Sequence, residues 1–134
     1  MRNLVEAALK ARQQAYTPYS HFAVGAALLG EDGVIYTGCN VENAAFSPTC
    51  CAERVAVFKA VSHGVRRFRA ICVAGGPEGE APTEECPPCG VCRQVLREFC
   101  PPEMPVLLAG GDGAYRETTL GALLPESFGP DHLG

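Results

Sequence analysis

The chain has 134 residues, of which 47% are hydrophobic and 19% charged, and its formal net charge is −4. We expect residues 1–134 to form one globular domain, since this length supports a real core. The acidic balance argues against a nucleic-acid partner, which needs a basic face to neutralise phosphates. No apolar run can span a bilayer, and residues 1–10 lack the apolar core of a secretion signal. We therefore expect a cytoplasmic protein with no membrane partner.

The first half of the chain predicts two helices around a hairpin. Small and apolar residues recur at helical spacing over residues 4–15. Apolar segments at 22–29 and 34–36 flank a glycine-rich turn and predict two antiparallel strands. A loop then leads to a helix that begins near Cys51 and ends at Gly64. This helix is apolar on most sides, which suits a central position or a subunit interface.

The second half predicts three strands and one further helix. Residues 69–73 form the third strand, and the segment 75–87, rich in Gly, Pro and Glu, is expected to be a surface loop. A helix over 89–99 and strands at 106–108 and 114–118 follow, and the tail after residue 120 shows little periodicity. The order strand, helix, strand, helix, strand predicts a layered α/β sheet with parallel members.

Three cysteines stand at spacings typical of a zinc site. Cys51 begins one predicted helix, and Cys89 and Cys92 lie one turn apart at the start of another. Unpaired backbone N–H groups and the helix dipole favour thiolates there. Three thiolates leave a fourth zinc position for water, as in catalytic sites, and Glu53 can face that position without being a ligand. We therefore predict a catalytic site with one Zn²⁺ per chain.

Other readings of the eight cysteines remain open. Cys50 or Cys86 as a fourth ligand would make a structural zinc site. A ferredoxin-type iron–sulfur run would also use Cys86, but the gap from Cys92 to Cys100 is seven residues where that run has three. Neither alternative gives Glu53 a role. Only the spacing to Glu53 favours Cys51 over Cys50 as the ligand.

The remaining polar and thiol side chains have simpler assignments. Without a secretion signal, the thiols are expected to be reduced. Arg54 and Arg93 follow the proposed ligands closely and are candidates to donate hydrogen bonds to the sulfurs. Three cysteines with apolar neighbours are expected in the core, and three histidines without metal spacing at the surface. They are Cys39, Cys72 and Cys100, and His21, His63 and His132.

Cys51-Ala52-Glu53 together with Pro88-Cys89-x-x-Cys92 resembles the zinc site of the cytidine deaminase family. Residues 19–27, 38–45 and 92–95 also resemble segments of its small free-nucleoside members, so the likeness extends from the first helix to Phe128. The resemblance implies a three-layer α/β/α sandwich with a mixed five-stranded sheet. It also implies a homotetramer whose active sites are completed by neighbouring chains.

The same resemblance implies roles for individual residues. Glu53 would be the proton shuttle, where the dipole alone would explain a helix-start acid. Asn40 and Glu42, ordinary loop residues by spacing, would hold a ribose hydroxyl. Phe22, otherwise strand core, would pack against the pyrimidine ring, and Phe128 would do so in a neighbouring subunit's site. The backbone around Ala52 and Cys89 would contact the ring edge.

The resemblance implies hydrolytic deamination of cytidine and 2′-deoxycytidine to uridine and 2′-deoxyuridine, with release of ammonia, as in pyrimidine salvage. The closest alternative is a deaminase of modified cytosine nucleosides. A deaminase of single-stranded nucleic acid is less well supported, since those enzymes resemble a His-x-Glu form of the motif and need basic and aromatic contacts along a strand. A non-catalytic zinc module would show four protein ligands.

Overall fold

A mixed five-stranded sheet forms the centre of the computed structural model, which describes residues 1–134, and its strand order is β2-β1-β3-β4-β5. β3 and β4 are parallel, and every other neighbouring pair is antiparallel. The mixed sheet expected from the sequence is therefore confirmed. The strands are β1 (Phe22–Gly30), β2 (Ile35–Cys39), β3 (Phe68–Pro77), β4 (Pro105–Ala109) and β5 (Tyr115–Thr119).

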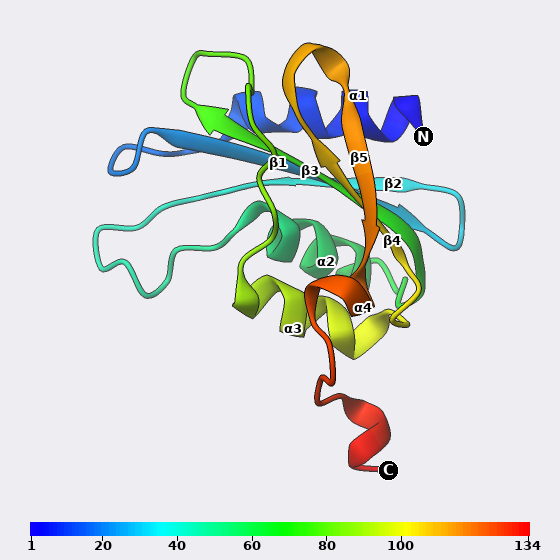
Figure 1. The fold of residues 1–134 in the computed structure, drawn as a ribbon. Helices are drawn as coiled ribbons and strands as arrows, with labels where there is room; N and C mark the ends of the chain where they lie inside the picture. Colours follow the sequence, from blue (N-terminus) through cyan, green and yellow to red (C-terminus); the bar gives the residue numbers. More distant parts are fainter.

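Helices cover both faces of this sheet, with α1 (Arg2–Ala11) on one side and α2 (Ala52–Ser62) and α3 (Gly90–Phe99) on the other (Figure 1). Successive side chains along β1 point to opposite faces of the sheet, so this strand packs against the helices on both sides. Ala27 packs in the apolar cluster under α1, and Leu28 packs in the cluster under α2 and α3. Full burial of a side chain such as Leu28 contributes about 2 kcal/mol to stability. The predicted three-layer α/β/α sandwich is confirmed.

Two elements end about four residues away from their predicted ends, the largest differences from the sequence prediction. The first helix ends at Ala11, and a 3₁₀ turn (Arg12–Gln14) replaces its expected last turn. The third strand continues to Pro77 instead of ending at Val73, because β1 supplies a pairing partner for each of residues 74–77. Glycine and proline at 75–77 resemble a loop in composition, yet the neighbouring strand holds them extended.

The cysteines expected in the core divide into two groups. Cys72 and Cys100 are buried, as predicted, whereas Cys39 is only half-buried because it is the last residue of β2 at the edge of the sheet. The three histidines are exposed, as expected. No helix combines the length and the hydropathy that crossing a membrane requires.

The chain ends in a tail that leaves the three layers. After the short helix α4 (Leu120–Leu123), the backbone runs away from the sheet and closes with a 3₁₀ turn, Pro130–His132 (Figure 1). Arg97 on α3 holds this tail through its Nε, which donates to Ser127 Oγ at 2.8 Å, and its Nη2, which pairs with Asp131 Oδ1 at 2.7 Å. The side chain of Phe128 is left exposed.

Candidate active site

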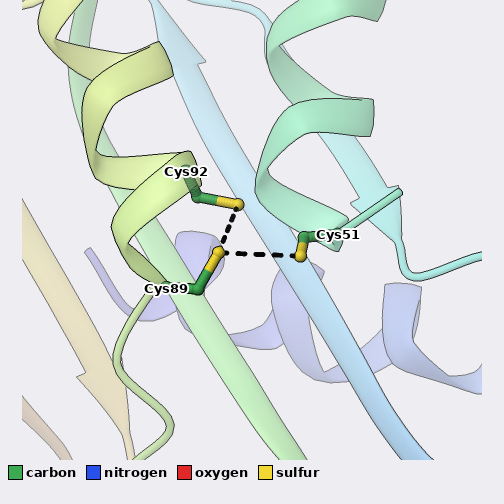
Figure 2. Close-up of side chains that lie close together, drawn as sticks. All are labelled: Cys51, Cys89 and Cys92. Atoms are coloured by element: carbon green, nitrogen blue, oxygen red, sulfur yellow. Dashed lines mark hydrogen bonds between the residues drawn. The ribbon is translucent and has the colours of Figure 1, made fainter. Parts of the chain in front are cut away.

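Three thiols meet where α2 and α3 begin. Cys51 and Cys89 are the residues immediately before the two helices, Cys92 lies in the first turn of α3, and all three side chains point toward one another (Figure 2). Their Sγ atoms lie within 4.8 Å of one another, with Cys51 to Cys89 at 3.8 Å and Cys89 to Cys92 at 3.5 Å. Tetrahedral zinc with Zn–S bonds of about 2.3 Å needs sulfurs about 3.8 Å apart. The thiols therefore fit zinc in both donor type and spacing.

Close packing of α2 on the sheet sets the position of Cys51. β2 carries Gly38 directly beneath the start of α2, and a Cβ atom there would overlap the Ala52 carbonyl oxygen and lie 2.6 Å from the Ala56 nitrogen. Any larger residue at position 38 would push the helix start outward. The absence of a side chain at this one point lets the first ligand reach the two thiols of α3.

Protons and charge are unevenly shared among the thiols. The neighbouring Cys92 thiol, assisted by Arg54, lowers the pKa of Cys51 to about 5. The same interaction raises the pKa of Cys92 above its ordinary value. Arg54 Nη2 lies 3.3 Å from Cys51 Sγ, as the sequence predicted, while its buried Nε has no partner. Arg54 thus places a positive charge against thiols that metal binding would leave anionic.

The carboxyl group of Glu53 lies beside these thiols on the first turn of α2. Its residue is only 4% exposed, and this burial raises the pKa of Glu53 to about 7. The negative charge of Cys51 raises it further, whereas the nearby Cys92 thiol opposes the shift. Ala52, the residue before it, is completely buried and begins the helix, where a backbone N–H has no intrahelical partner.

The polar residues expected at the substrate pocket both bind the backbone near the start of β1. Asn40 accepts from the Val24 nitrogen at 2.8 Å and donates to the Phe22 oxygen at 2.9 Å. The Glu42 carboxylate accepts from the Tyr19 and Ser20 nitrogens at 3.0 and 3.1 Å and from the Ser20 hydroxyl. That hydroxyl holds the pKa of Glu42 below its ordinary value, so this carboxylate is an ionised acceptor at neutral pH.

The two aromatic candidates lie in different surroundings. Phe22 opens β1 and its residue is 41% exposed, so the ring is available beside the polar pair instead of being buried as strand core. Phe128 is 57% exposed, and its ring stacks on His132 of the same tail with ring centroids 5.1 Å apart. The structure therefore leaves both rings accessible, one on the sheet and one on the tail.

The prediction that Arg93 contacts the sulfurs is wrong. Its Nε donates to the Pro88 oxygen and its Nη1 to the Leu123 oxygen, each at 2.7 Å. Residue 93 follows Cys92 on α3, so its side chain leaves the helix about 100° around the axis from the thiol. Arg93 instead ties the start of α3 to the preceding loop and to α4.

The other cysteines near the centre do not join the thiol group. Its members are Cys51, Cys89 and Cys92 alone, which disfavours a structural zinc site or an iron–sulfur cluster with a fourth cysteine ligand. Cys86 remains half-buried nearby, and burial, followed by the negative charges of Glu53 and Cys51, raises the pKa of Cys86 to about 11. A three-layer fold with three convergent thiols beside a buried carboxylate defines a zinc-dependent enzyme domain.

Known proteins share this arrangement. Residues 1–108 match the family described as the cytidine and deoxycytidylate deaminase zinc-binding region. A cytidine deaminase of Sporosarcina psychrophila is 53% identical over 133 residues, which cover 99% of this chain and 94% of that protein. The chain belongs to the cytidine and deoxycytidylate deaminase family, whose activity is hydrolysis of a C–N bond.

Solved structures agree with this assignment. A cytidine deaminase from Burkholderia pseudomallei has a TM-score of 0.85 and 46% identity, covering 94% of this chain and 97% of that one. A cytidine deaminase from Mycobacterium tuberculosis has a TM-score of 0.78 and 42% identity, and the match covers 95% of each chain. Fold and sequence therefore agree along nearly the whole chain.

Proposed function

We propose that this protein hydrolyses cytidine and 2′-deoxycytidine to uridine and 2′-deoxyuridine with release of ammonia, as a step of pyrimidine salvage. The observation that carries the proposal is the convergence of Cys51, Cys89 and Cys92 next to the buried carboxyl group of Glu53. Three ligands leave a coordination position open, which is the arrangement of a catalytic metal site. Glu53 has no structural ion-pair partner that would account for its burial.

Glu53 moves the protons of the proposed reaction. Bound by the three thiols, zinc would supply a Lewis acid that makes water easier to deprotonate. Glu53 takes one proton from the attacking water and delivers it to N3 of the ring while the water oxygen bonds to C4. The C4–N bond then breaks, and Glu53 relays the remaining hydroxyl proton to the departing amino group, which leaves as ammonia. Water and cytidine thus give uridine and ammonia.

The proposed nucleoside site extends from Glu53 toward the start of β1. The ring of Phe22 would pack against the pyrimidine, and the free backbone N–H at Ala52 would meet the ring edge. A carboxylate offers about four acceptor positions, of which Glu42 uses three on the 19–20 turn. One remains for a ribose hydroxyl, and Asn40 likewise keeps one amide N–H after its two bonds to β1.

We further propose a cytoplasmic homotetramer of chains, each a single catalytic domain over residues 1–134. Exposed aromatic and aliphatic side chains on several elements support assembly, with Phe46 69%, Val91 59% and Phe58 51% exposed. Phe128 projects on the tail and does not pack in the apolar clusters of its own chain, which supports a contact with a neighbouring subunit's active site. Light scattering that finds a monomer would refute the assembly.

Loss of cytidine absorbance in protein of measured zinc content tests the proposal, with Glu53→Gln assayed beside the wild type. We expect about one zinc per chain in both proteins and a loss of turnover of about 10²–10⁴-fold in the variant. Glu98→Gln, which changes an exposed acid on α3, is the matched control and should retain full activity. Near-normal turnover by Glu53→Gln would overturn the mechanism.

A zinc-loaded wild type that does not act on cytidine would refute the proposed substrate. The same assay on cytosine nucleosides with modified rings or sugars would then identify the alternative class. Parallel assays with cytidine and deoxycytidine measure the sugar preference.

A further inference from the structure

Arg12 is a buried arginine without a carboxylate partner. Its residue is 8% exposed, and it takes part in none of the ion pairs of the molecule. Its guanidinium donates four hydrogen bonds, all to backbone carbonyl oxygens at 2.7–3.1 Å. Nε reaches Ala23, Nη1 reaches Glu80, and Nη2 reaches Gly76 and Pro77.

These carbonyls belong to three segments that meet at one end of the sheet. Ala23 and Gly76 are paired partners in the β1–β3 ladder, and Phe22 and Pro77 form the next and last pair. Glu80 lies in the connection that leads from β3 to α3. Arg12 therefore fastens the first residues of β1, the last residues of β3 and the following loop to one another.

The fastened end of the ladder borders the proposed active site. A Cβ atom built on Gly75 would lie 2.7 Å from Cys86 Sγ and 3.2 Å from a ring carbon of Phe22. The Phe22 ring and the Cys86 side chain thus both lie against the backbone of β3 next to the residues that Arg12 holds. Cys86 precedes the ligand Cys89 by three residues, so this contact also places the approach to α3.

We propose that Arg12 is a positioning residue that acts from the α1 side of the sheet on both halves of the active site. Through the start of β1, Arg12 fixes the position of Phe22. Through the end of β3 and residue 80, it fixes the segment that brings Cys89 to the other thiols. The effect on Phe22 rests on the proposed nucleoside site. The effect on Cys89 rests only on the group of three thiols.

Arginine suits this position for a geometric reason. The four carbonyl oxygens surround the side chain in different directions, so they require a planar group with several fixed donors. A guanidinium group carries five N–H donors. A lysine ammonium has three donors on a single atom and cannot reach acceptors on both sides of the fork. Arg12→Lys therefore keeps the positive charge but loses the hydrogen bonds that join the three segments, whereas Arg12→Met loses both.

The test compares zinc release from Arg12→Met, Arg12→Lys and the wild type after addition of a chromogenic chelator. Arg69→Met is the matched control, because Arg69 also donates to a backbone carbonyl, that of Glu31, away from the thiols. We expect release about tenfold faster in both Arg12 variants and unchanged release in the control. Circular dichroism verifies that each variant is folded.

Steady-state kinetics provide the second readout. With rates expressed per bound zinc, we expect KM for cytidine to rise about tenfold in both Arg12 variants while kcat falls much less, because Phe22 moves and Glu53 does not. A folded Arg12→Met protein with normal zinc release and normal KM would overturn the proposal, even if it melts at a lower temperature. Failure of the wild type to deaminate cytidine refutes the proposed function instead and leaves the zinc-release test valid.

Chemical rescue covers the case in which the substituted proteins do not fold stably. Arg12 lines a cavity of about 650 Å³ together with Leu9, Gln13 and Pro82, so a small cation can reach the vacated position. We expect millimolar methylguanidinium to restore folding and slow zinc release in Arg12→Ala and to leave the wild type unchanged. Methylguanidinium that restores folding without slowing zinc release, or restores neither, would overturn the proposal.

Discussion

The thiol centre and the C-terminal tail attach their functional side chains to the fold in opposite ways. Cys51 and Cys89 lie directly before helices whose inner faces are packed in the core under the sheet. Phe128 lies on a segment outside the layers, held by polar contacts from Arg97 and Gln94 on α3. Core packing determines the position of the thiols, whereas a few hydrogen bonds determine the position of the ring.

This difference separates the part of the proposed site that one chain forms alone from the part that a second chain would complete in the proposed tetramer. The thiols meet within a single chain, so metal binding requires no neighbour. Phe128 keeps more than half of its surface exposed, so its proposed contribution depends on an approaching subunit. We expect substitutions at the centre to be severe and substitutions in the tail to be mild and specific to substrate binding.

Replacing a proposed ligand should have the largest effect. Cys89→Ala removes one of three thiolates, and we expect loss of bound zinc, activity below detection and a lower melting temperature, since metal binding and folding are coupled. Zinc analysis and thermal unfolding measure these effects. Cys50→Ala is the matched control and should keep about one zinc per chain. A zinc-free Cys50 variant beside a zinc-loaded Cys89 variant would reverse the ligand assignment.

Phe128→Ala should have an intermediate effect confined to substrate binding. Loss of an aromatic contact corresponds to a rise in KM of about tenfold, with zinc content unchanged. If the proposed tetramer forms, mixed assemblies identify the site on which Phe128 acts. When Phe128→Ala chains are co-assembled with inactive Glu53→Gln chains, the neighbour supplies the missing ring, and a fraction of sites should recover normal KM. No recovery on mixing would show that Phe128 acts only within its own chain.

Release of the tail should have a smaller effect than removal of the ring. Arg97→Met abolishes the bonds to Ser127 and Asp131 but leaves the one from Gln94 to the Phe128 carbonyl. We expect KM to rise about threefold, zinc content to stay constant and protease cleavage within residues 124–134 to accelerate. Cleavage at the wild-type rate would mean that these bonds do not hold the tail.

The smallest expected effect is a change in the pKa of one carboxyl group, that of Asp131, in the Arg97→Met variant. Arg97 holds the pKa of Asp131 below its ordinary value, with His132 contributing, so this pairing stabilises the tail above about pH 4 and is lost as pH falls through the lowered value. In Arg97→Met, the pKa of Asp131 measured by carboxyl NMR should rise toward the ordinary value. Asp32, whose pKa is lowered by Tyr36, should not change and serves as the internal control.

The group of three thiols was predictable because the spacing of its cysteines in the sequence is typical of a metal site. The single-turn separation of Cys89 and Cys92 and the helix-start position of Cys51 are visible in the sequence, and the structure brings the three together. The layered sheet followed from strand and helix periodicity, and the family resemblance gave the mixed five-stranded architecture that the structure confirms. Glu53 is buried beside the thiols, while its chemical role stays a prediction until the variant is assayed.

Interactions between distant segments were not predictable from the sequence. In the sequence, Arg12 resembles an ordinary polar helix residue. Its hydrogen-bond acceptors are backbone oxygens up to 68 positions away, and every residue carries such an oxygen, so the residue types do not reveal them. Gly75 and Gly76 indicated a loop, because the local sequence does not show that this segment pairs with β1. Arg93 was assigned from its proximity to a ligand in the chain, but helical geometry turned its side chain toward Pro88 and Leu123.

The meeting of Cys51 with Cys89 across 38 residues also makes the stability of the fold a function of free zinc concentration. An ion that binds only the folded chain adds about 1.4 kcal/mol to the free energy of unfolding for each tenfold rise in its free concentration above the dissociation constant. Two otherwise identical preparations, buffered at different zinc levels, would therefore melt at different temperatures. Near its melting temperature, the folded fraction of this chain therefore rises with the zinc level of its surroundings.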